Sequence, residues 1–112
     1  MGETKEYLYL IRPTRADMLE TGPTPAEENI LAEHFVYLKD LVDKDVVVLA
    51  GRTLTTDEHS FGIVVFRANT LNQAQAIMGS DPAVDRGVMR AELYPYRIAL
   101  LGSNRLSGGE GP

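Results

Sequence analysis

The sequence has 112 residues, 44% of them hydrophobic and 24% charged, which predicts one globular domain with a core of ordinary size. Its formal net charge of −5 disfavours nucleic acid or an anionic membrane surface as a partner, and the absence of cysteine excludes disulfides and thiolate chemistry. Since no apolar run approaches the ~18 residues of a membrane span, we expect a cytoplasmic protein without a membrane partner.

The first half of the chain predicts a strand, a long loop and a helix. Residues 6–12 (EYLYLIR) alternate aromatic and aliphatic side chains, which indicates a strand buried on both faces. The prolines, glycine and mixed charges of residues 13–23 predict a loop without a regular element, and we hypothesise that it covers a pocket as a lid. Thr24 and Glu27 have the spacing of a capping box, so a helix is expected over residues 25–43.

The second half predicts a hairpin, a short helix and a closing strand. Residues 46–53 and 61–68 are rich in β-branched side chains and flank a polar turn, as in a β-hairpin. Residues 70–78 open with a second capping box and carry a short apolar helical face. Apolar and polar residues nearly alternate over 87–101, which predicts one strand bent at its proline. We expect a single domain over residues 1–101 and a flexible, glycine-rich tail over 102–112.

The order strand, helix, strand, strand, helix, strand predicts a fold of the α+β class. Its simplest solution is the ferredoxin-like βαββαβ topology, a four-stranded antiparallel sheet with two helices on one face. The first strand nevertheless carries Leu8 and Leu10 on one side and Tyr7 and Tyr9 on the other. Because the helices cover only one face, we predict a homodimer in which two sheets pack together and enclose a cavity.

His34 lies within the apolar stripe of the expected first helix, which runs through Leu31, Phe35, Leu38 and Leu41. One interpretation is a core histidine whose ring nitrogens bond to backbone groups or tyrosine hydroxyls. The other is a general acid or base, because imidazole gains and loses a proton near neutral pH. Spacing alone does not separate the two.

Asp81 stands before a proline in SDPAVDRG, just past the second helix. It has the position of a cap on a short helical turn over residues 83–85. Alternatively, its carboxylate accepts a hydrogen bond from the His34 ring and holds the tautomer of that ring. His34 lies roughly 15 Å along its helix, so this contact depends on how far the helix overhangs the sheet.

Four segments together resemble a known family: AEHFVYLKDL with its helical histidine, VVLAGRT with its glycine turn, SDPAVDRGV, and the closing ELYPYR. Over residues 6–101 the chain resembles the YciI-like, or YCII-related, family. That resemblance implies a dimeric α+β barrel of ferredoxin-like topology, with a pocket histidine and aspartate as the proposed catalytic residues. The matching positions are His34 and Asp81. The sequence departs from the family at Arg52, where proline often follows the glycine of the turn.

Arg52, Arg12 and Tyr9 are the predicted ligand-binding residues. An arginine at the mouth of the pocket would suit an anionic or phenolate-like ligand, although an exposed surface arginine fits the pattern as well. Arg12 follows the first strand and borders the hypothesised lid, and Tyr9 lies on the same strand.

His59 and the neighbouring acidic residues Asp57 and Glu58 form the remaining cluster of titratable side chains. Adjacent residues in one polar turn cannot all face a single ion, so we predict no metal and no other cofactor.

Two classes of function remain. The first is a small cofactor-independent enzyme that uses His34 and Asp81 for acid-base chemistry of the elimination, isomerisation or hydrolysis type on a small aromatic or carbonyl compound. The family resemblance implies a dehydrochlorinase-type elimination, and a cofactor-free monooxygenase stays open. The alternative is a non-catalytic ligand-binding or interaction module of the same fold. RNA binding lacks the basic and aromatic residues that it needs.

Overall fold

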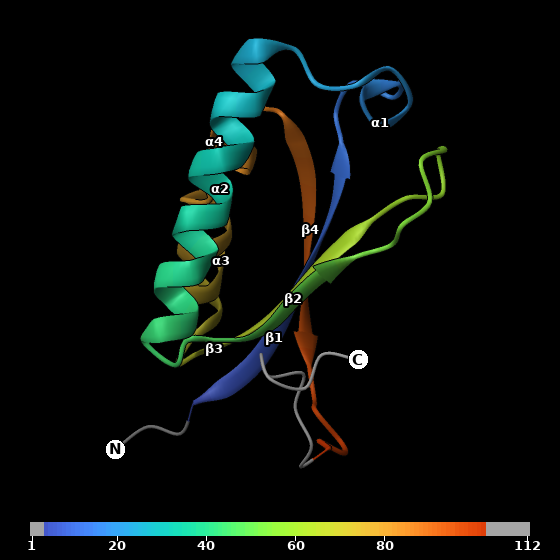
Figure 1. Cartoon of the computed structure of the whole chain (residues 1–112). Coiled ribbons are helices and arrows are strands. Elements are labelled where there is room, and N and C mark those ends of the chain that lie inside the picture. The colour runs from blue at the N-terminus through green and yellow to red at the C-terminus, as the bar shows by residue number, and fades with distance from the viewer. Residues whose placement is uncertain (1–3, 103–112) are drawn as a thin grey trace, which may run out of the picture.

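The computed structural model describes residues 4–102 and contains a four-stranded antiparallel sheet with helices α2, α3 and α4 on one face (Figure 1). The elements in chain order are β1 (Lys5–Pro13), α1 (Met18–Thr21), α2 (Pro25–Asp43), β2 (Val47–Arg52), β3 (Gly62–Ala68), α3 (Leu71–Gly79), α4 (Pro82–Asp85) and β4 (Met89–Tyr96). The strand order is β2-β3-β1-β4, with β1 paired to β3 and β4 and with β2 paired to β3. This confirms the predicted ferredoxin-like α+β fold.

The core lies between this sheet and its helices. Tyr7, Tyr9 and Ile11 of β1 are buried. Leu8 and Leu10, which point to the other face of the sheet, are only half buried. Successive strand side chains point to opposite faces, so the prediction that β1 is buried on both faces is wrong for the single chain. The rings of Tyr9 and Phe66 meet edge to face with centroids 5.6 Å apart, a geometry that aromatic pairs favour.

Both capping signals in the sequence begin helices in the structure. The Thr24 hydroxyl accepts from the Glu27 backbone N–H at 3.1 Å, and the Glu27 carboxylate accepts from the Thr24 N–H at 2.8 Å. The Thr70 hydroxyl accepts from the Gln73 N–H at 3.1 Å. These contacts satisfy backbone donors that the first helical turn leaves free, so α2 and α3 begin where predicted.

The structure corrects two predicted segments. The loop over residues 13–23 contains the short helix α1, because Met18 is buried against the domain and anchors a turn there. The last strand ends at Tyr96, and residues 97–102 continue without regular structure. The predicted tail lies outside the described residues except for Gly102.

The sheet face opposite the helices is the predicted dimer surface. It carries Leu8 and Leu10, and the partly exposed rings of Tyr94 and Tyr96 lie on the same side of β4. The structure is that of one chain, so the homodimer stays a prediction.

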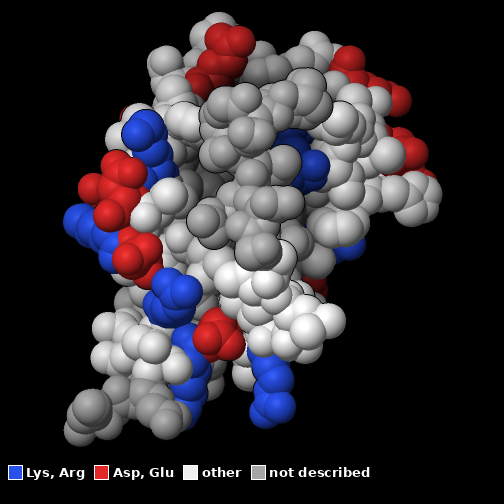
Figure 2. Space-filling view, turned by 60° about the horizontal axis from the view of Figure 1, so that its bottom comes forward, with Lys and Arg blue, Asp and Glu red and all other residues white. Residues whose placement is uncertain are grey.

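Charged side chains of both signs are mixed on one face of the molecule (Figure 2). Figure 2 shows basic and acidic residues next to one another along one side of the view. None of the helices between residues 4 and 102 is both long and apolar enough to cross a membrane.

Candidate active site

A cavity of about 780 Å³ lies between α2 and the β2–β3 side of the sheet. Most of its lining is apolar: Ile11, Pro13, Met18, Leu19, Pro23, Leu31, Phe35, Leu38, Val42, Ala50, Phe61, Ile63, Val64 and Met89. The polar lining residues are His34, Lys39, Asp43, Arg52, Thr53 and Ser60. This volume suits a small organic molecule. The cavity lies on the helical side of the sheet and within one chain, so it is not the inter-sheet cavity that the dimer argument predicted.

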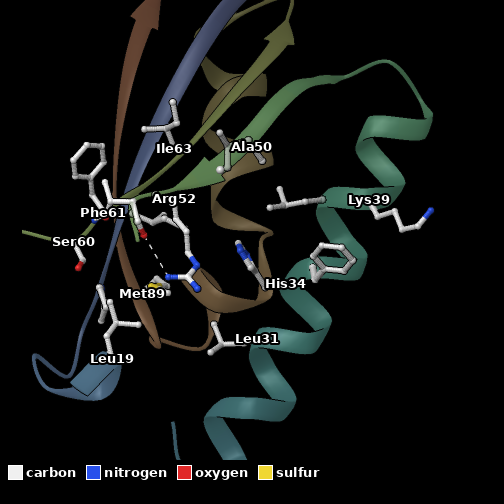
Figure 3. Close-up of a pocket in the computed structure, with 18 of the residues that line it drawn as sticks. Leu19, Leu31, His34, Lys39, Ala50, Arg52, Ser60, Phe61, Ile63 and Met89 are labelled. Carbon is white, nitrogen blue, oxygen red and sulfur yellow. Dashed lines mark hydrogen bonds between the residues drawn. The ribbon is translucent and has the colours of Figure 1, made fainter. Parts of the chain in front are cut away.

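His34 reaches the cavity from the inner face of α2, as Figure 3 shows. Leu31 and Leu38 also line the cavity. They lie three residues before and four residues after His34, a spacing that places all three side chains on one helical face. The His34 side chain is 16% exposed, and its Nδ1 lies 2.7 Å from Oδ1 and 2.9 Å from Oδ2 of Asp81. The two residues that the sequence singled out are therefore in direct contact.

Asp81 is fully buried at the junction of α3 and α4. Its Oδ1 accepts from the Ala83 backbone N–H at 2.9 Å and so caps α4. Its Oδ2 accepts from the Tyr9 hydroxyl at 2.7 Å. Both predicted uses of Asp81 thus occur together, since the carboxylate has enough lone pairs to cap a helix and to bind the imidazole.

The meeting of His34 and Asp81 depends on how the helices pack. Glu33 of α2 forms an ion pair with Arg86, the residue that follows α4, at 2.9 Å. The Tyr37 hydroxyl of α2 donates to the backbone carbonyl of Ile77 in α3 at 2.7 Å. These contacts hold α3 and α4 against the middle of α2, which is where His34 lies.

The buried carboxylate also acts on the neighbouring phenols. Burial raises the pKa of Tyr9 well above its ordinary value, and the negative charge of Asp81 and the hydrogen bond to it raise it further. Burial, followed by the charge of Asp81, raises the pKa of Tyr37 to about 12. Both hydroxyls therefore keep their protons at neutral pH and act as hydrogen-bond donors.

The contact with Asp81 determines which ring nitrogen of His34 is available. A carboxylate only accepts hydrogen bonds, so the bonding proton lies on Nδ1. Nε2 has no hydrogen-bond partner among residues 4–102 and belongs to the ring edge away from Asp81, on the cavity side. A neutral imidazole in this state presents a lone pair to the cavity and can accept a proton there.

The fold agrees with the comparison against known families. The family model of the YCII-related domain matches residues 6–97. The chain belongs to the YCII-related family.

Two solved structures resemble this YCII-related domain. One is the 5-chloro-2-hydroxyhydroquinone dehydrochlorinase of Burkholderia phenoliruptrix in complex with 2,5-dihydroxybenzoquinone, at 18% identity and a TM-score of 0.58, covering 81% of this chain and 93% of that one. The other is an uncharacterised protein of Thermotoga maritima, at 12% identity and a TM-score of 0.49, covering 85% of this chain and all of the other. A comparison with the curated proteins finds no match.

The structure places the three predicted ligand-binding residues of the YCII-related domain in different surroundings. Arg52 lines the cavity. Tyr9 is completely buried behind Asp81 and does not line it, so its hydroxyl supports the carboxylate instead of facing a ligand. Arg12 points to the opposite face of the sheet, where it lies 3.9 Å from Glu92 and over the ring of Phe61. It borders a separate pocket of about 130 Å³.

The role of Tyr9 as a partner of Asp81 was missed by the sequence argument. A signal was present, because Tyr9 shares its parity with Tyr7 and so faces the helices. Nothing local shows that its hydroxyl reaches Asp81, which lies 72 residues further along the chain.

The loop over residues 13–23 closes one end of the cavity of the YCII-related domain through Pro13, Met18, Leu19 and Pro23. Arg15 organises it: the guanidinium donates to both carboxylate oxygens of Glu27, at 2.7 and 3.1 Å, and to the Gly22 carbonyl at 2.9 Å. The hydrogen bonds from Arg15, with that from the Thr24 backbone, lower the pKa of Glu27 to about 2. The role of this loop as a lid stays a prediction.

His59 lies outside the site. Its side chain is 78% exposed and lies 3.5 Å from Asp57, in the turn that precedes β3. No group of three or more potential metal ligands occurs among residues 4–102.

Proposed function

We propose that this YCII-related protein is an enzyme that moves a proton on a small, largely apolar compound, with His34 as the catalytic acid-base. The observation that carries the proposal is the orientation of the ring. Its Nδ1 is hydrogen-bonded to the buried Asp81, and the edge of the ring that carries Nε2 faces a cavity of about 780 Å³. An imidazole oriented in this way by a buried carboxylate is a common arrangement for general acid-base catalysis.

In the proposed step, Nε2 of His34 accepts a proton from a C–H or O–H bond of the substrate. The imidazolium that forms is stabilised by the adjacent carboxylate of Asp81. Asp81 keeps its position because Tyr9 and the Ala83 N–H also bond to it. These two groups position the acid-base pair and do not touch the substrate.

The proton can then follow one of two routes. Return of the proton from Nε2 to another atom of the substrate is an isomerisation. In an elimination, the electron pair of the broken C–H bond forms a double bond while a leaving group departs with its own bonding pair. The dehydrochlorinase of similar fold makes a chlorinated, hydroxylated aromatic ring the first substrate class to test.

The second candidate function is binding of a small molecule without turnover. The observation that favours it is the apolar, solvent-open cavity, whose rim includes Phe35 at 67% exposed and Val42 at 47% exposed. A binding module needs this cavity but does not need a particular tautomer of His34.

The tautomer is measurable by ¹⁵N NMR of the histidine rings. At a pH where the ring is neutral, His34 should carry its proton on Nδ1, and His59 serves as an exposed reference in the same spectrum. In Asp81→Asn the amide no longer requires a donor from the ring, so the Nδ1–H form should lose its dominance. A His34 ring protonated on Nε2 in the unmodified protein would remove the base from the cavity.

Turnover is tested with a panel of chlorinated and non-chlorinated hydroxyaromatic and carbonyl compounds in D₂O, followed by ¹H NMR. We expect conversion or solvent-deuterium incorporation that His34→Gln abolishes and Lys39→Gln preserves, because Lys39 lies on the rim and pairs with Asp43. Compounds that bind equally well to both variants and are never converted would favour the binding module.

A further inference from the structure

Arg52 is one of the charged residues of the cavity lining that the proposed chemistry does not use. It ends β2, and its guanidinium extends into the cavity on the side that His34 faces (Figure 3). Its hydrogen bond to the Thr53 carbonyl is long, at 3.4 Å. Within residues 4–102, no carboxylate forms an ion pair with Arg52. The structure therefore shows an inward cation without a counter-ion from this part of the chain.

The other cation on the lining is arranged differently. The Lys39 ammonium points away from the cavity in Figure 3 and lies 3.9 Å from Asp43 of the same helix. Lys39 therefore has an acidic neighbour at the rim, and its ammonium is directed away from the cavity (Figure 3). Arg52 is thus the lining residue whose positive charge is open to a molecule inside the cavity.

The surroundings of Arg52 favour a particular class of ligand. Most of the lining is apolar, so the body of an organic ligand finds apolar contacts there while Arg52 supplies a positive charge. A guanidinium presents two parallel N–H donors that match the two oxygens of an oxyanion. One cation without a partner suits one negative charge.

We propose that the cavity binds organic monoanions: a carboxylate or phenolate oxygen bonds to Arg52, and an apolar body fills the space between α2 and the sheet. That such an anion is the substrate rests on the proposed function. The guanidinium lies on the side of the cavity that His34 faces (Figure 3), so an anion on Arg52 brings the body of the molecule to Nε2. Arg52 determines which molecules enter, and His34 acts on them.

The test compares anions with neutral molecules of the same shape by calorimetry at low salt. The pairs are benzoate with benzamide and 4-nitrophenolate with 4-nitroanisole. We expect the unmodified protein to bind at least one anion roughly tenfold more tightly than its neutral partner, a preference that weakens as salt is added. The pair that shows the preference distinguishes a carboxylate ligand from a phenolate ligand.

Two variants identify the residue responsible. Arg52→Gln should bind anion and neutral partner alike, whereas Lys39→Gln should keep the full preference. Arg52 is exposed at the end of a strand, so its replacement should leave the fold intact, which circular dichroism checks. Equal affinities in the unmodified protein for both pairs would overturn the inference, as would a preference that survives in Arg52→Gln.

His34→Gln separates this inference from the proposed function. It should keep the preference for anions, because Arg52 is unchanged, while any turnover is lost. An anion preference without turnover of any compound would overturn the enzymatic function alone. Turnover of neutral compounds without an anion preference would overturn the inference alone.

Discussion

Tyr9→Phe tests the support of the acid-base pair most directly. The substitution removes one hydroxyl and keeps the ring, which is completely buried and packs edge to face on Phe66. The lost interaction is a 2.7 Å hydrogen bond to the carboxylate of Asp81. Hydrogen bonds to charged groups contribute about 1.5–3 kcal/mol, so the free energy of unfolding should fall by about 2 kcal/mol.

Tyr37→Phe is the matched control. Its hydroxyl donates at the same distance, 2.7 Å, but to the neutral backbone carbonyl of Ile77. A neutral hydrogen bond contributes about 1 kcal/mol, so this variant should lose roughly half as much stability as Tyr9→Phe. Urea unfolding at neutral pH measures both losses, provided that the dependence on denaturant stays unchanged.

A double-mutant cycle assigns the effect to the pair. In an Asp81→Asn background the charge is gone, and Tyr9→Phe should cost less than about 1 kcal/mol. The explanation is refuted if Tyr9→Phe costs no more than Tyr37→Phe, or if its cost is the same with and without the Asp81 carboxylate.

Three further predictions concern pH and association. Folding raises the pKa values of Tyr9 and Tyr37 above the ordinary 10.0, so the unfolded chain releases these protons first as the pH rises. The contribution of the two hydroxyls to the free energy of unfolding is therefore complete below about pH 10 and is lost above it, as the pH approaches about 12 for Tyr37. Urea unfolding at a series of alkaline pH values should show that Tyr9→Phe reduces the fall of the unfolding free energy above pH 10 by about 1.4 kcal/mol per pH unit. An unchanged dependence on pH would contradict the buried contact. Folding lowers the pKa of Glu27 from 4.5 to about 2, so the contribution of its carboxylate to stability is present above pH 4.5 and is lost as the pH falls to 2. The difference in unfolding free energy between the unmodified protein and Glu27→Gln should shrink over that interval. A difference that does not depend on pH would argue against the Arg15 contact. Size-exclusion chromatography with light scattering should show that the unmodified protein is a dimer at micromolar concentration. The variant Leu10→Glu, on the sheet face away from the helices, should be a monomer. A monomeric unmodified protein would contradict the dimer prediction.

The sequence predicted the elements whose signals are local. Thr24 and Glu27 cap α2, and this signal is local because a capping box spans one helical turn. The alternation of side chains in β1 is also local, because successive strand residues point to opposite faces of the sheet. The short helix α1 escaped prediction because its signal is the burial of Met18 against distant elements. Arg12 has the parity of Leu8 and Leu10 and so lies on the sheet face away from the helices, which the prediction of a ligand-binding role did not take into account.

The sequence by itself determined that the chain folds as a ferredoxin-like α+β domain and that a histidine occupies the inner face of its first long helix, since these features follow from periodicities of two and 3.6 residues. Only the tertiary structure decided that His34 meets Asp81, 47 residues away, and that Tyr9 supports this contact. The physical reason is that hydrogen bonds between distant segments depend on the packing of α4 against α2 and of the helices on the sheet. Pairwise spacing along the chain does not determine that packing.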